Sequence, residues 1–84
     1  MVTMTEQKTL KDYRSELSPK VSQEAMARRG NVTLVTYRKL ERGGVTTYST
    51  ARGVLEALNV FRRTNEPRLE DIPETEIPKI FNLN

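Results

Sequence analysis

The sequence contains no cysteine and no histidine. The absence of cysteine excludes disulfides and thiolate metal sites. The absence of histidine removes the most common general base and the most common metal ligand. We therefore expect no enzymatic activity, no catalytic residue, no metal site and no cofactor.

Long hydrophobic runs are also missing. No stretch approaches the roughly 18 consecutive apolar residues of a membrane span, and the N-terminus lacks the apolar core of a secretory signal. The 84 residues are 36% hydrophobic and 30% charged, which is an ordinary globular composition. These features predict a single small domain that is cytoplasmic and does not bind a membrane.

Positive charge is unevenly distributed along the chain. The formal net charge is +3, but residues 1–63 carry +6 and residues 64–84 carry −3. A basic body followed by an acidic tail suggests that the body binds an anionic partner such as a nucleic acid.

Apolar residues at helical spacing predict four main helices between residues 9 and 63. Each begins after a capping residue; the candidates are Thr9, Ser22, Thr33 and Thr47. Each ends at a residue that disfavours helix; the candidates are Ser18-Pro19, Gly30-Asn31, Gly43-Gly44 and Asn59. Gly53, inside the fourth helix, marks either a close helix–helix approach or a merely tolerated glycine.

The two ends of the chain have a different composition. Residues 1–8 have no apolar period and are predicted to be a flexible N-terminus. Residues 64–84 contain three of the four prolines and five acidic residues, and form a Pro-containing C-terminal extension. Its apolar residues suggest that it covers a surface of its own domain or of a second copy; they are Ile72, Ile77, Ile80, Phe81 and Leu83. The extension is thus predicted to serve dimerisation or partner binding.

The two short helices joined by residues 30–33 form a helix-turn-helix candidate. The run from Val21 to Gly43 resembles the Cro/repressor (XRE-like) helix-turn-helix family, and the resemblance covers about residues 9–60. The matches are Val21-Ser22-Gln23-Glu24, Ala27, Val32-Thr33, Leu40-Glu41-Arg42-Gly43 and Ala57-Leu58-Asn59-Val60. The resemblance implies an all-α, lambda-repressor-like fold of four to five helices. Its helix from about Thr33 to Arg42 is expected to enter the major groove of double-stranded DNA.

The resemblance also implies which side chains face the bases, namely Leu34, Val35, Arg38 and Lys39. Arg38 and Lys39 can donate to guanine or to phosphate. Leu34 and Val35 depart from the polar residues usual at these positions, and both are predicted to be exposed. They are expected to contact thymine methyl groups, with contact to another protein as the alternative.

A second set of residues is implied to contact the DNA backbone. Ser22 and Gln23 begin the bracing helix, whose N–H groups suit a phosphate. The other phosphate-contact candidates are Arg28, Thr33 and Arg42. The resemblance gives Glu41 a structural role, paired with Arg14 of the first helix. Gly30 replaces an alanine-like residue and is expected to loosen the bracing helix.

These observations predict a sequence-specific DNA-binding transcriptional regulator of a bacterium or phage, and specifically a repressor. A homodimer on a palindromic site is expected, because one helix reads too few bases for useful selectivity. One alternative is the antitoxin of a toxin–antitoxin pair, which binds DNA with this domain and a toxin with its C-terminal tail. A further alternative is a protein-interaction module that uses Leu34 and Val35.

Overall fold

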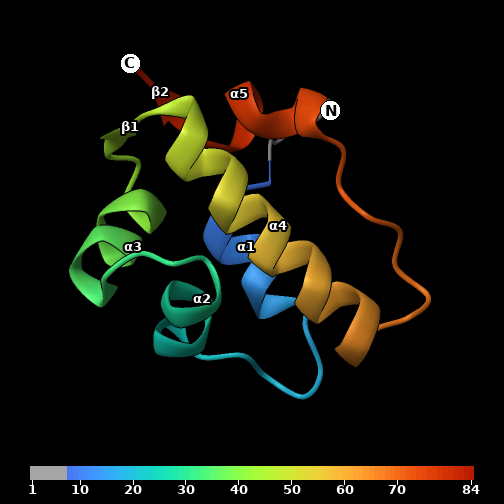
Figure 1. Cartoon of the computed structure of the whole chain (residues 1–84). Helices are drawn as coiled ribbons and strands as arrows, with labels where there is room; N and C mark the ends of the chain where they lie inside the picture. Colours follow the sequence, from blue (N-terminus) through green and yellow to red (C-terminus); the bar gives the residue numbers. More distant parts are fainter. Residues whose placement is uncertain (1–7) are drawn as a thin grey trace, which may run out of the picture.

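The computed structural model describes residues 8–84, so nearly all of the predicted flexible segment 1–8 lies outside the described residues. The fold is mostly helical, as the sequence predicts, and α4 runs through its centre (Figure 1). The elements are α1 (Leu10–Ser15), α2 (Gln23–Arg29), α3 (Leu34–Glu41), β1 (Val45–Thr46), α4 (Tyr48–Asn65), the 3-10 turn η1 (Glu74–Glu76), α5 (Ile77–Ile80) and β2 (Asn82–Leu83).

The helix starts predicted from the sequence are confirmed. Thr9 accepts a hydrogen bond from the backbone N–H of Asp12 at 3.1 Å, and the Asp12 carboxylate accepts one from the N–H of Thr9 at 3.0 Å. Ser22, Thr33 and Thr47 each accept a hydrogen bond from the N–H three residues later. Caps of this kind each stabilise a helix by about 1 kcal/mol, and they depend on local sequence alone.

Glycine has different roles after the two helices of the helix-turn-helix. Gly43 after α3 has φ 89°, and Asn31 after α2 has φ 61°, so both lie in the left-handed region. Gly30 has an ordinary φ of −84° and is buried. A Cβ atom on Gly30 would lie 3.3 Å from the Cα of Val54, closer than most real contacts. Gly30 therefore permits the close approach of α2 to α4. Gly53 lies at the same contact, where an added Cβ would be an ordinary 3.4 Å from the carbonyl oxygen of Gly30.

The fourth helix is longer than predicted. Asn59 does not end it, and α4 continues to Asn65, across the predicted boundary at residue 63. The Asn59 side chain is buried and donates from Nδ2 to the carbonyl of Ile72 at 3.0 Å, while its Oδ1 accepts from the N–H of Ile72 at 2.8 Å. Because both the nitrogen and the oxygen of this amide bond to a distant segment, the amide does not compete with the helix backbone, and the prediction of a stop was wrong.

The C-terminal extension packs against its own domain. Ile72, Ile77 and Phe81 are buried in the same core as Met26 and Tyr37. Figure 1 shows the extension leaving the end of α4 and returning along the molecule to α5 and β2. There β2 pairs in parallel with β1. Neither of these strands was predicted from the sequence. The described extension is thus part of the domain's core.

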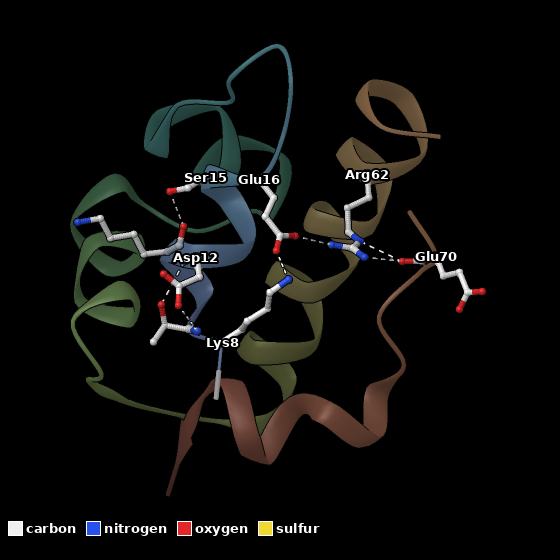
Figure 2. A network of polar contacts seen from close by, with 8 residues as sticks. Lys8, Asp12, Ser15, Glu16, Arg62 and Glu70 are labelled. Carbon is white, nitrogen blue, oxygen red and sulfur yellow. Dashed lines mark hydrogen bonds and ion pairs between the residues drawn. The ribbon is translucent and has the colours of Figure 1, made fainter. Parts of the chain in front are cut away.

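A buried arginine joins the extension to two helices (Figure 2). Arg62 of α4 donates from Nη2 to the carbonyl of Glu70 at 2.7 Å, and its Nη1 lies 3.5 Å from the carboxylate of Glu16 after α1. Its guanidinium also lies over the ring of Tyr13, and Glu16 pairs in turn with Lys8. These contacts satisfy a charge that would be costly to bury alone.

Candidate DNA-binding interface

Helices α2 and α3 pack against each other through the predicted turn, and α2 also packs on α4. The buried side of α3 carries Tyr37 and Leu40, both in the core. Its outer side carries Val35, which is 74% exposed, together with Arg38 and Lys39, which are also exposed. This arrangement leaves the outer side of α3 free to enter a DNA groove, while α2 packs against α3 and supports it.

Leu34 is only partly exposed, whereas the sequence predicted full exposure for Leu34 and Val35 alike. It is the first residue of α3, directly after the cap Thr33. Full exposure of this residue was therefore wrong, and Val35 remains the exposed apolar side chain of α3.

Glu41 at the end of α3 pairs with Arg14 of α1, as the family resemblance implied. Its Oε2 lies 2.6 Å from Nε of Arg14, and its side chain is only 4% exposed. Arg14 also donates to the carbonyl of Val21, just before α2. Burial acts to raise the pKa of the Glu41 carboxyl, but the neighbouring donor groups of Arg14, Tyr37 and Gln23 and the charge of Arg14 outweigh burial and lower the pKa below its ordinary value.

Gly44, in the turn after α3, lies close against Lys39. A Cβ atom on Gly44 would lie 2.4 Å from Cγ and 3.0 Å from the carbonyl oxygen of Lys39. The N–H of Gly44 also donates to that carbonyl at 2.9 Å. Only glycine leaves room for the Lys39 stem to lie against this turn, so the pair Gly43-Gly44 does more than end the helix.

The predicted phosphate-contact residues do not all lie together. Arg28 and Thr33 line one open hollow of about 600 Å³, together with Asn31, Val32, Thr36 and Thr50. Ser22, at the start of α2, and Arg42, at the end of α3, are both exposed. Thr50 of α4 was not singled out in the sequence, although Thr47 and Thr50 repeat the threonine spacing of Thr33 and Thr36.

Gln23 is the first residue of α2, and its partly buried side chain bonds to two residues of α3. Its Nε2 donates to Oε1 of Glu41 at 2.8 Å, and its Oε1 accepts from Nε of Arg38 at 3.4 Å. The structure therefore brings a predicted phosphate-contact residue together with a predicted base-contact residue.

Charge is divided between two parts of the surface. Acidic groups of the extension pair with arginines of α4: Asp71 with Arg63, and Glu74 with Arg52. The exposed cations of α2 and α3 are Arg28, Arg29, Arg38, Lys39 and Arg42. Asp71 and Glu74 are thus paired with α4 and not with these cations.

The two packed helices, their tight turn and the exposed cations of the second helix define a helix-turn-helix protein. The sequence model of the helix-turn-helix family matches residues 10–60, more than half of the chain, and the chain belongs to this DNA-binding family. The match confirms the resemblance to the Cro/repressor (XRE-like) type and the all-α, lambda-repressor-like fold. No curated protein and no solved structure matches the chain.

Residues 8–84 contain neither a membrane-spanning helix nor a cluster of metal ligands. None of the helices described there is both long and apolar enough to cross a membrane. Within the same range, no three aspartate or glutamate side chains gather in a way that would hold a metal ion.

Proposed function

We propose that this chain is a sequence-specific transcriptional repressor that reads the major groove with α3. The observation that carries the proposal is the outer side of α3, where exposed Arg38 and Lys39 flank exposed Val35 on a helix whose other side is buried. Arginine and lysine suit the acceptors on guanine, and a valine side chain suits the thymine methyl group. Leu34, at the start of the same helix, is half-buried, and only the exposed part of its side chain adds to this apolar contact.

Backbone contacts position the domain on the duplex. Ser22, Gln23, Arg28, Thr33 and Arg42 are proposed as the phosphate contacts. The hollow that joins Arg28 to Thr33 supports this assignment, and Thr50 extends it onto α4. Such contacts fix the register of the protein without reading sequence.

The active species is proposed to be a homodimer, because a single α3 spans too few base pairs for useful selectivity. An antitoxin is the second candidate, with the extension binding a toxin. The burial of Ile72, Ile77 and Phe81 favours the regulator over the antitoxin. These side chains already pack in the core of their own domain, so they are not exposed for binding a toxin.

Selection from a random DNA library, followed by fluorescence anisotropy, tests the proposal. We expect a palindromic sequence to be enriched, and its affinity to fall linearly with log salt, with a slope of about −0.9 per phosphate contact. Lys39→Ala should weaken binding to the selected site about tenfold and binding to random DNA less. Lys79→Ala on α5 is the matched control and should change neither affinity. A salt-independent affinity, or no enriched sequence, would refute the proposal.

A further inference from the structure

A line of polar contacts runs from α1 to the outer side of α3. Arg14 donates from Nε and Nη2 to the two carboxylate oxygens of Glu41, at 2.6 and 3.3 Å. The carboxylate accepts from Nε2 of Gln23 at 2.8 Å, and Oε1 of Gln23 accepts from Nε of Arg38 at 3.4 Å. The line thus begins at a nearly buried ion pair and ends at a proposed base-contact residue.

The buried end of this line determines which way the Gln23 amide points. An ionised carboxylate only accepts hydrogen bonds, and Arg14 keeps Glu41 ionised. The NH₂ end of the Gln23 amide must therefore face Glu41, which leaves the carbonyl end facing Arg38. In this orientation the amide presents an acceptor to the guanidinium; the reverse orientation would present a donor to a cation.

We infer that Gln23 is a positioning residue for Arg38, holding its guanidinium through Nε so that the terminal nitrogens point to the DNA bases. This inference rests on the proposed DNA-binding function. A long arginine side chain loses much rotamer freedom when it binds, and a side chain that is already held loses less. Among residues 8–84 no other side chain hydrogen-bonds to Arg38, so Gln23 is the group that restricts it.

The same residue can also bind phosphate. The Nε2 group of glutamine carries two hydrogens, and only one of them is used by Glu41. Gln23 therefore has two separable contributions: a phosphate contact that acts on every DNA sequence, and the positioning of Arg38, which acts only where Arg38 reads a base.

A double-mutant cycle separates these contributions. Gln23→Ala, Arg38→Ala and the double variant are titrated against the selected operator and against a random duplex of equal length. We expect Arg38→Ala to lower the ratio of the two affinities about tenfold, and Gln23→Ala to lower it by a smaller factor. In the Arg38→Ala background, Gln23→Ala should leave the ratio unchanged while still weakening both affinities.

Arg28→Ala is the matched control, because Arg28 is a proposed phosphate contact that does not touch Arg38. It should weaken both affinities equally in either background. An equal loss of the ratio from Gln23→Ala with and without Arg38, or no loss at all, would overturn the inference. If the wild-type protein does not distinguish operator from random DNA, the proposed function itself fails.

The free protein gives a second readout that needs no DNA. The Nε–H group of Arg38 should show restricted motion in ¹⁵N relaxation measurements and become as mobile as that of exposed Arg42 in Gln23→Ala. Glu41→Gln should have a similar effect, because an amide at position 41 no longer dictates the orientation of Gln23. Unchanged Arg38 dynamics in both folded variants would also overturn the inference.

Discussion

At the scale of single residues, the pair of Arg14 and Glu41 connects α3 to α1 and to the chain entering α2. Replacing Arg14 with alanine leaves a nearly buried carboxylate without its cation. We expect Arg14→Ala to lower the free energy of unfolding by about 2–4 kcal/mol. Urea denaturation at neutral pH measures this loss, and Lys11→Ala, an exposed change on α1, is the control. A loss no larger than that of Lys11→Ala would mean that the pair contributes little.

The lowered pKa of Glu41 makes part of the stability depend on pH. In the unfolded chain this carboxyl takes up a proton near its ordinary pKa of 4.5, whereas in the folded protein it does so only at lower pH. The contribution of Glu41 is therefore fully present above about pH 4.5 and is lost as the pH falls through the folded pKa. Denaturation midpoints from pH 7 to pH 3 should fall less steeply for Glu41→Gln than for the wild type. Parallel curves would contradict this assignment.

Individual site residues were predictable to different degrees. The Arg14–Glu41 pair followed from the family resemblance, and the exposure of Val35 followed from helical spacing. The contact between Gln23 and Arg38 could not be predicted, because it depends on how closely α2 and α3 approach each other. The partial burial of Leu34 was also missed.

At the scale of elements, two glycines of the α2–α4 contact should respond in opposite ways to alanine. Gly53 lies inside α4, and an added Cβ there would make only an ordinary 3.4 Å contact. Gly53→Ala should therefore raise the stability by about 0.5–1 kcal/mol, through helix propensity. At Gly30 an added Cβ would lie 3.1 Å from the carbonyl oxygen of Met26 and 3.3 Å from Val54, so Gly30→Ala should lower it by about 1 kcal/mol or more. Thermal melting of both variants measures the two effects. Equal shifts of the melting temperature would show that the contact between α2 and α4 at Gly30 is not tight.

The elements themselves were predictable where the signal is local. All four N-caps stand where the sequence predicted them, because a cap needs only its own helix turn. The end of α4 and the pairing of β1 with β2 were missed. Both depend on segments far apart in the sequence: Asn59 with Ile72, and Val45 with Asn82.

At the scale of the whole molecule, the extension completes the core of the domain. Phe81 is 4% exposed, and Phe81→Ala should lower the stability by about 3–5 kcal/mol. Removing residues 66–84 takes away Ile72 and Ile77 as well, and we expect the truncated chain to lose cooperative unfolding in circular dichroism. Pro78→Ala, at an exposed site in the same segment, controls for a nonspecific effect. A truncated chain that melts like the full one would show that the extension is dispensable for the fold.

The parallel pairing of β1 with β2 has a consequence for the order of events during synthesis. The helix-turn-helix emerges from the ribosome well before Phe81 and Leu83, yet the core that supports it closes only when these residues reach β1 and α4. Until then the nascent chain carries an uncovered apolar surface on α4, which a chaperone or a neighbouring nascent copy can bind. Helix α3 is thus translated early, but its supporting core is completed only when β2 has been made.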